Sequence, residues 1–197
     1  MRPKPHNHHP LPPHARTVYQ GRRWSIHEWE QELFDGSVGI FESISRSDAV
    51  IVFPVFDDDK LVILEEEQPH WGRISDSIVA GGVEDDEDVF DAAQRELLEE
   101  TGMVFKDWYL VHAEQRSIDT HSNFYIFVAK NHLENKDKKL DAGERTHPKI
   151  ISFDELIGMT RERKFFHKNY FVDEYIVRDK IDELFDLLRN PEKYSIV

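Results

Sequence analysis

The segment from Gly81 to Met103, GGVEDDEDVFDAAQRELLEETGM, constrains the fold more than any other stretch of the chain. Its apolar residues recur at helical spacing and form one stripe, made of Val89, Ala93 and Leu97. Gly102 follows the last periodic residue, as is typical of the end of a helix. The segment therefore predicts an amphipathic helix over about 88–101 whose apolar stripe anchors it to a core.

Three carboxylates are expected on one face of this helix. Glu96, Glu99 and Glu100 stand at positions i, i+3 and i+4, so their side chains project within about a turn of one another. Because like charges at this spacing repel, the pattern favours a cation among them, and carboxylate oxygens suit a hard ion such as Mg²⁺. The Gly81-Gly82 pair upstream permits a tight loop close to a ligand, and Arg95 can hold one carboxylate by a bidentate pair. The alternative is a solvated acidic helix.

The composition restricts the classes of partner. Asp and Glu number 39 against 25 Lys and Arg, a net charge of −14, which argues against a nucleic-acid partner because phosphate backbones need facing cations. The absence of cysteine excludes thiolate zinc sites, cysteine nucleophiles and disulfides. No apolar run approaches the roughly 20 residues that cross a bilayer, and the first residues have no apolar signal segment. We therefore expect a cytoplasmic protein without a membrane partner.

The 197 residues divide into three parts. Residues 1–16 hold five prolines and four histidines and predict a flexible tail, although the histidines could instead bind a transition metal. Residues 17–47 consist of short strands with a turn at Asp35-Gly36, and they predict a small antiparallel layer that packs on the main body or on a second subunit. The main domain is expected over 48–197.

Within the main domain, apolar runs predict several strands and two helices. The strands are expected at 49–56, 61–64, 74–80, 108–113, 123–129 and 149–153. A second amphipathic helix is expected over about 172–188. Strands mixed with a few helices, without strict alternation, favour an α+β protein in the form of an α/β/α sandwich around a mixed sheet.

The segment 81–103 resembles the Nudix box. That motif is a glycine, five residues, a glutamate, seven residues, and then Arg-Glu-apolar-any-Glu-Glu-any-Gly-apolar. The sequence matches it at every fixed position, namely Gly81, Glu87, Arg95, Glu96, Leu97, Glu99, Glu100, Gly102 and Met103. Seven fixed identities at background frequencies of about 6% each make a chance match on the order of one in a million. With the strands on either side, the resemblance covers about 48–188 and implies the Nudix fold.

The resemblance implies hydrolysis of a nucleoside diphosphate linked to another moiety, with Mg²⁺, or Mn²⁺ in its place, as the cofactor. The implied metal ligands are the carboxylates of Glu96, Glu99 and Glu100 and the carbonyl of Ala80 or Gly81. Glu87 and Arg95 would orient the loop and the helix, and Gly81 and Gly102 would be structural members of the motif. Metals in such a site neutralise the pyrophosphate and lower the pKa of a bound water.

A weaker resemblance points to the ADP-ribose and ADP-sugar pyrophosphatase branch. Its members carry an N-terminal strand layer that often exchanges between the subunits of a dimer, and residues 17–47 match that placement, with Arg46 in the junction that follows. The stretch 67–69 resembles the branch's Glu-Gln-aromatic-Arg segment without its arginine, for which Arg73 is the nearest candidate. The stretch 77–81 lacks the glutamate and proline that the branch shows before the box. The resemblance implies a homodimer that acts on a nucleotide sugar such as ADP-ribose.

Three further residues are candidates for the site. The branch uses a glutamate on a late loop as a catalytic base or an additional metal ligand, and Glu144 is the candidate here, with a surface glutamate as the alternative. Arg116 could contact phosphate alongside Arg46 and Arg73, or be a surface arginine. Adenine recognition calls for a stacking aromatic, for which Trp29 is the choice, with Trp24 and Trp71 also available and a core or dimer-interface role as the alternative.

Two other functions stay open. The same machinery could hydrolyse nucleoside triphosphates or dinucleotides. A module that has kept the fold without the catalytic rate could instead sense nucleotides by binding them, although such members usually lose glutamates of the box, and all are present here.

Overall fold

The computed structural model describes residues 3–5, 7–138, 140, 143, 145–165 and 169–196. The strands are β1 (Arg16–Gln20), β2 (Ser25–Glu32), β3 (Val38–Ser45), β4 (Ala49–Phe56), β5 (Lys60–Glu67), β6 (Ser75–Ser77), β7 (Val79–Gly82), β8 (Met103–Ser117), β9 (Thr120–Asn135) and β10 (Arg145–Ser152). The helices are α1 (Val89–Thr101), α2 (Phe153–Arg161), α3 (Tyr170–Val177) and α4 (Ile181–Arg189), with a short 3₁₀ turn at Pro191–Lys193. Among the described residues, no helix has the length and apolarity needed to cross a membrane.

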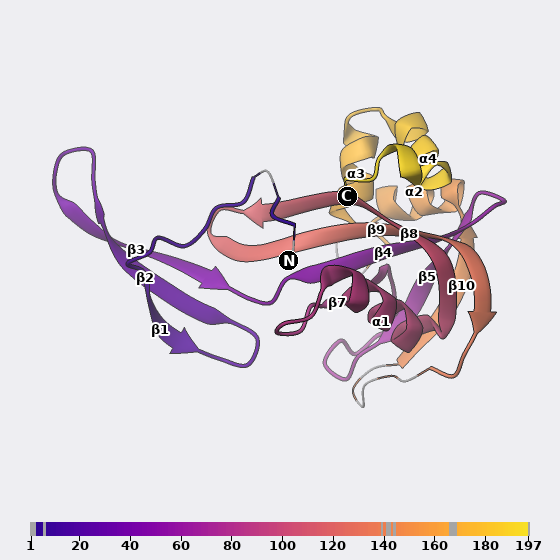
Figure 1. The fold of residues 1–197 in the computed structure, drawn as a ribbon, viewed down its shortest axis with the longest axis horizontal. Coiled ribbons are helices and arrows are strands. Elements are labelled where there is room, and N and C mark those ends of the chain that lie inside the picture. Colours follow the sequence, from indigo (N-terminus) through magenta and orange to yellow (C-terminus); the bar gives the residue numbers. More distant parts are fainter. Residues whose placement is uncertain are drawn as a thin grey trace.

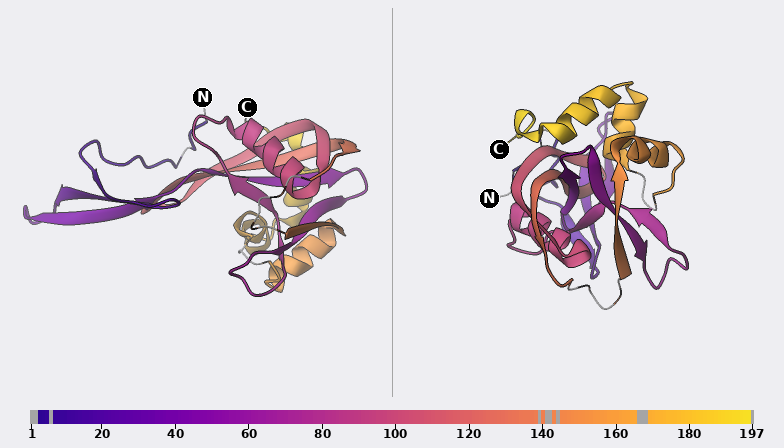
Figure 2. Two further views of the ribbon diagram at one scale, coloured as in Figure 1. Left: turned by 90° about the horizontal axis from the view of Figure 1, so that it is seen from below. Right: turned by 90° about the vertical axis from the view of Figure 1, so that its right-hand side faces the viewer.

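The strands form one mixed, curled sheet. Its main path runs β1-β2-β3-β9-β4-β5-β10, and β6, β7 and β8 pair with β5, β4 and β9. Strand β9 runs parallel to β3 and β4, and the other pairs are antiparallel. Helix α1 covers one face of the main sheet, and α2, α3 and α4 cover the other (Figures 1 and 2). The prediction of an α+β sandwich around a mixed sheet is confirmed.

Strand β4 contributes to the cores on both sides of the sheet. Val50 and Val52 pack toward α1, whereas Phe53 and Val55 pack toward α2–α4, and all four are buried. A strand buried on both faces has no reason to alternate apolar with polar residues. Burial on both faces therefore explains the nearly continuous apolar run at 49–56.

The first three strands form an arm that projects from the main body (Figure 1). The arm joins the main sheet through two parallel residue pairs, Ile44 with Thr120 and Ser45 with His121. Its large exposed apolar side chains are Val18, Tyr19, Trp24, Leu33, Phe34, Val38, Ile40 and Phe41. A three-stranded layer that exposes this much apolar surface has little core of its own.

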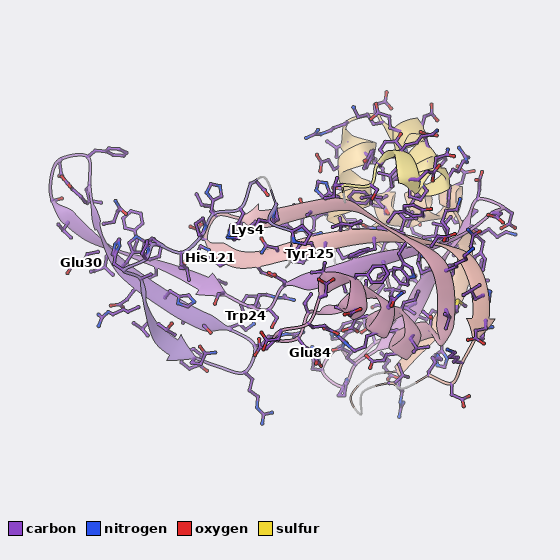
Figure 3. All side chains as sticks on the ribbon, in the orientation of Figure 1. Lys4, Trp24, Glu30, Glu84, His121 and Tyr125 are labelled. Carbon is purple, nitrogen blue, oxygen red and sulfur yellow. The ribbon has the colours of Figure 1, made fainter. Side chains whose placement is uncertain are left out.

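The N-terminal tail lies along the β8–β9 hairpin. Its described residues up to position 15 form neither helix nor strand. Asn7 Nδ2 donates to the carbonyl oxygen of Gln115 at 2.9 Å, and Gln115 N donates back to Asn7 Oδ1 at 3.1 Å. Tyr125, labelled in Figure 3, donates its hydroxyl proton to the carbonyl of Pro3 at 2.9 Å. The flexibility of the tail stays a prediction.

Two expectations about the C-terminal part were wrong. The single helix expected over 172–188 is two helices, because Asp179 adopts a left-handed backbone (φ 56°) that ends α3 before α4 begins. Helix α2 was not expected at all, and Phe153, which was assigned to a strand, is its first residue. The signal was present in the sequence, since Ser152 and Glu155 form a reciprocal capping box at its start.

The expected strand over 74–80 is also two strands. Strand β6 pairs with β5 and strand β7 pairs with β4, so the chain changes partner between Ser77 and Val79. This change brings β7 beside β4 and directly in front of α1. It therefore sets the position of the loop that opens the acidic helix.

Candidate functional site

Helix α1 is defined at both ends by its caps. Asp88 accepts a hydrogen bond from Phe90 N at 3.0 Å at the start of the helix. Gly102 ends it in the left-handed conformation (φ 74°), and its N–H donates to Leu98 O at 2.8 Å. A methyl group at Gly102 would also meet the backbone of Lys136 at 2.4 Å. The glycine of the motif is therefore required both by its φ and by the close approach of β9's C-terminal extension.

Arg95 links the loop before α1 to the acidic face of the helix. It holds Glu87 by a bidentate pair, Nε to Oε1 at 2.8 Å and Nη2 to Oε2 at 2.9 Å. Its Nη1 reaches Glu96 at 2.7 Å and Glu99 at 3.2 Å, and its Nη2 also donates to the carbonyl of Gly82 at 2.9 Å. The hydrogen bonds with Glu87, followed by those with Glu96, raise the pKa of Arg95 above its ordinary value.

Glu87 closes the loop from the other side. Besides the pair with Arg95, its Oε2 accepts a hydrogen bond from Glu84 N at 2.9 Å. The residues between β7 and α1 are thus bound to a side chain that is itself bound to the helix. The arrangement fixes the loop relative to the carboxylates.

Two of the three predicted carboxylates converge on adjacent residues of β7. Glu96 lies so close to Gly81 that a methyl group built there would stand 1.9 Å from Glu96 Cδ. Glu100 is buried, and one of its carboxylate oxygens accepts a hydrogen bond from Ala80 N at 3.2 Å. Its own backbone carbonyl accepts from Thr146 Oγ1 on β10 at 2.6 Å. Strand β7 and two carboxylates of α1 therefore meet at one place.

The donor set at this place fits a hard divalent cation. Within the described ranges, no three histidine, aspartate or glutamate side chains are arranged around a common point. Glu96 and Glu99 both bond Arg95, and Glu96 and Glu100 also meet the backbone of Gly81 and Ala80. Mg²⁺ keeps several waters and is commonly held by one or two carboxylates together with phosphate oxygens of the substrate. Two carboxylates beside an exposed strand end are a donor set of that kind.

The structure brings together Arg46 and Arg116, two of the residues predicted to bind substrate. Arg46 follows β3, and Arg116 lies where β8 changes register between Gln115 and Ser117. Arg116 Nε donates to Glu114 at 2.8 Å, and its guanidinium lies 4.0 Å from the centre of the Phe124 ring. His112 and Arg116 hold the pKa of Glu114 at about 2.

The aromatic residue beside Arg46 is Trp24 rather than Trp29. The guanidinium of Arg46 lies over the Trp24 ring, 5.3 Å from its centre. Trp29 packs against Phe41 on the arm, at a distance of 6.0 Å between ring centres. Because Trp29 is five residues further along the chain than Trp24, it lies about 16 Å further out along the strand direction. The sequence had offered both tryptophans, and the register of β2 with β3 separates them.

Arg73 does not join this group in the described structure. Arg73 lines a separate cavity of about 350 Å³, together with Arg163, Lys164 and Phe165. Glu144 lies outside the described residues. Its role as a base or additional ligand stays a prediction.

Comparisons with known proteins agree with this geometry. A family model described as the NUDIX domain matches residues 45–174. A solved structure titled "Crystal structure of ADP compounds hydrolase" superposes with a TM-score of 0.68 at 20% sequence identity, covering 86% of this chain and 92% of that one. No curated protein sequence matches the chain. At this identity the structural likeness concerns the fold.

Proposed function

Because the chain belongs to the NUDIX domain family, and is by that membership a Nudix pyrophosphohydrolase, we propose that it hydrolyses the pyrophosphate bond of a nucleoside diphosphate derivative with Mg²⁺. ADP-ribose or a related nucleotide sugar is the proposed substrate. The products are then a nucleoside monophosphate and a sugar phosphate.

The observation that carries this proposal is the convergence of Glu96 and Glu100 on β7. Glu100 is buried, and the N–H of Ala80 orients it. Glu96 is held between Arg95 and the bare Cα of Gly81. An unpaired cluster of surface glutamates would show none of these constraints. Side chains fixed in this way are positioned in advance of a ligand.

Nudix hydrolases generally use divalent metal ions, and we assign Mg²⁺ to Glu96 and Glu100, with the carbonyl of Ala80 and with Glu99 as further ligands. Mn²⁺ accepts the same oxygen donors. When bound, such an ion neutralises the pyrophosphate and lowers the pKa of a coordinated water. Glu144, which directly precedes β10 in the sequence, is the proposed base or additional ligand.

The loop between β7 and α1 is held in place by two side chains that do not themselves react with the substrate. Arg95 and Glu87 act as positioning residues, because together they bind the loop between β7 and α1 to the helix. Loss of either would leave the glutamates in place on α1 but free the loop against which they are aligned.

The proposed substrate rests on two likenesses. The structural neighbour is titled a hydrolase of ADP compounds, and it shares the fold over 86% of this chain. The arm at residues 16–45 stands where the ADP-ribose pyrophosphatase branch carries its N-terminal layer. Both likenesses favour a nucleotide linked through pyrophosphate to a second moiety.

The arm also supports a homodimer. Its apolar side chains, such as Phe34, Ile40 and Phe41, are exposed in the part of the chain that the structure describes. A second copy of the chain would cover this surface and stabilise a layer that is too small to be stable alone. The dimer is part of the proposal.

A substrate panel with a variant of Glu100 tests the function. Wild-type protein is assayed with ADP-ribose, other nucleotide sugars, nucleoside triphosphates and dinucleotides in the presence of Mg²⁺. Glu100→Gln keeps the size of the side chain and removes its charge, and we expect turnover to fall by about 100-fold or more. Asp91→Asn makes the same change on the exposed side of α1 and serves as the control. Turnover of no pyrophosphate substrate would refute the activity, and an active Glu100→Gln would show that the site is elsewhere.

A further inference from the structure

Two arginines, Arg46 and Arg116, come together where the arm joins the main sheet, and a third, Arg23, is near enough for its charge to act on Arg46. Ser25 pairs with Ser45, so the residues just beyond that pair, Trp24 and Arg46, are also neighbours across β2 and β3. Arg46 N donates to the carbonyl oxygen of His121 at 3.3 Å, which brings Arg46 to the start of β9 and thus to the end of β8. Figure 3 shows Trp24 and His121 at this junction. The third arginine, Arg23, precedes Trp24 in the turn between β1 and β2.

The positive charges at this junction exceed the nearby negative ones. Burial lowers the pKa of Arg46, and the charges of Arg23 and Arg116 lower it further. In the part of the chain that the structure describes, Glu114 is the one carboxylate within ion-pair distance of any of the three guanidinium groups. Asp48 is close in sequence, but its Oδ1 accepts hydrogen bonds from the backbone and side chain of Asn123.

Aromatic rings hold two of the guanidinium groups. Arg46 lies over Trp24, and Arg116 lies between Phe124 and Tyr170, at 4.0 and 5.0 Å from the ring centres. Stacking restrains a guanidinium plane and leaves its N–H groups at the edge available to an acceptor. Trp24 is 39% exposed, so this arrangement is open to solvent. A half-buried excess of positive charge in a chain of net charge −14 is typical of a place that receives an anion.

The register of the sheet places this junction two strands from β7, on the other face of the sheet from the proposed metal ligands. Arg116 stacks on Phe124 and on Tyr170 of α3, whereas Glu96 and Glu100 meet β7 from the side of α1. Phe124, under Arg116, pairs with Ala49 on β4, and Ala49 pairs with Gly82 at the end of β7. Two strand spacings separate Phe124 from Gly82, which is about 10 Å. Gly82 directly follows the residues on which Glu96 and Glu100 converge. Within the described residues β7 pairs with β4 alone, so a substrate that joins the two faces would pass its other edge. The in-plane part of that path, about 10 Å, is similar to the length of one nucleoside.

We propose that Arg23, Arg46 and Arg116, with Trp24, form a subsite for a phosphomonoester carried by the substrate in addition to its pyrophosphate. This inference rests on the proposed function and narrows its substrate class. Three arginines offset by Glu114 leave a formal charge of about +2, and a phosphomonoester at neutral pH carries about −1.5 to −2. A phosphate of the pyrophosphate itself carries about one charge, and the proposed metal would neutralise it when bound. The favoured substrate is therefore a nucleoside diphosphate derivative with a further phosphate on its ribose.

Two pairs of measurements test the subsite on the full-length protein. The first compares kcat/KM for ADP-ribose and for its 2′-phosphorylated form in Mg²⁺. Hydrogen bonds to a charged group correspond to about a 10- to 100-fold change in binding, and we expect the phosphorylated form to be favoured by at least 10-fold. Arg46→Gln and Arg23→Ala should reduce that preference toward unity. Arg22→Ala removes the same charge from the exposed neighbouring residue and should leave the preference unchanged.

The second measurement is independent of turnover. Calorimetric titration without Mg²⁺ compares inorganic phosphate, ADP-ribose and 2′-phosphorylated ADP-ribose as ligands of the wild type and of the same variants. Binding of the monoester that weakens by about 10-fold or more in Arg46→Gln, and not in Arg22→Ala, supports the subsite even if neither compound is hydrolysed. In that case the proposed function is wrong and the subsite stands.

Other outcomes overturn the inference. Hydrolysis of both compounds with equal kcat/KM, or a preference that Arg46→Gln leaves intact, would leave the proposed function in place and remove the subsite. Equal binding of ADP-ribose and its 2′-phosphorylated form would do the same, because the additional phosphate would then contribute nothing. Binding of inorganic phosphate that is the same in the wild type and in both arginine variants would place the anion elsewhere.

Discussion

Gly81 should be far more sensitive to a single methyl group than its neighbour Gly82. The methyl of Gly81→Ala would stand 1.9 Å from Glu96 Cδ, whereas nothing lies within 4 Å of a methyl at Gly82. To reach an ordinary contact of 3.4 Å, the Glu96 carboxylate must retreat by about 1.5 Å. The two substitutions add the same atom to adjacent residues of one strand, so they form a matched pair.

The expected size of the effect follows from what Glu96 loses. Its side chain is the flexible part, so it turns away and gives up the 2.7 Å hydrogen bond to Arg95. A hydrogen bond to a charged group contributes about 1.5–3 kcal/mol. Because Arg95 keeps Glu87 and the carbonyl of Gly82, we expect the free energy of unfolding to fall by only about 1–2 kcal/mol. A misplacement of about 1 Å can cost about 100-fold in rate, and kcat/KM should fall by that order.

Urea unfolding and a hydrolysis assay in Mg²⁺ measure the two effects on the same preparations. Gly81→Ala should lose little stability and most of its activity, and Gly82→Ala should match the wild type in both. If the two variants have the same kcat/KM, the close contact between Glu96 and β7 has no part in the reaction, and the reasoning fails.

Two further predictions concern the free energy of unfolding at low pH and the association of the arm. Since the folded protein holds the pKa of Glu114 at about 2, below its ordinary value of 4.5, Glu114 stabilises the fold above about pH 4.5 and this contribution is lost as the pH falls toward 2. Urea unfolding at about pH 5 and pH 3 should therefore show a smaller decrease for Glu114→Gln than for the wild type, and equal decreases would contradict the assignment. Ile40→Glu should convert a dimer into monomers of 23.3 kDa in light scattering, while Glu32→Gln on the same arm should not; a monomeric wild type would refute the dimer.

Much of the main domain could be predicted because its sequence signals are local. The run at 49–56 coincides with β4, and the apolar stripe and caps of 88–101 coincide with α1 within one residue. Strand β9 was predicted too short because residues 130–135 at its end are mostly exposed and polar. Strand β8 was predicted to start at 108, although it begins directly after α1 with the apolar residues Met103 to Phe105. The break at Asp179 was missed because a left-handed backbone at a single aspartate leaves the helical spacing on either side unchanged.

In the candidate site, too, contacts within one helix could be predicted and contacts between distant strands could not. The spacing of the motif sufficed to place Glu96 and Glu100 on one face, because both lie on one helix. The meeting of Arg46 with Arg116 depends on the pairing of β3 with β9, and nothing in either local sequence encodes that contact. The choice between Trp24 and Trp29 likewise depends on where the register of β2 ends.

The contacts of the tail have a practical consequence for anyone who alters the N-terminus. Asn7 is bonded to the backbone of Gln115, and Gln115 is the residue immediately before Arg116. Shortening the chain past Asn7 would expose the backbone N–H and carbonyl of Gln115 to water. This is one residue from Arg116, whose guanidinium we assign to the proposed subsite. A shortened protein made for convenience in crystallisation could thus differ from the native one in affinity, and should be compared with it before its kinetic constants are used.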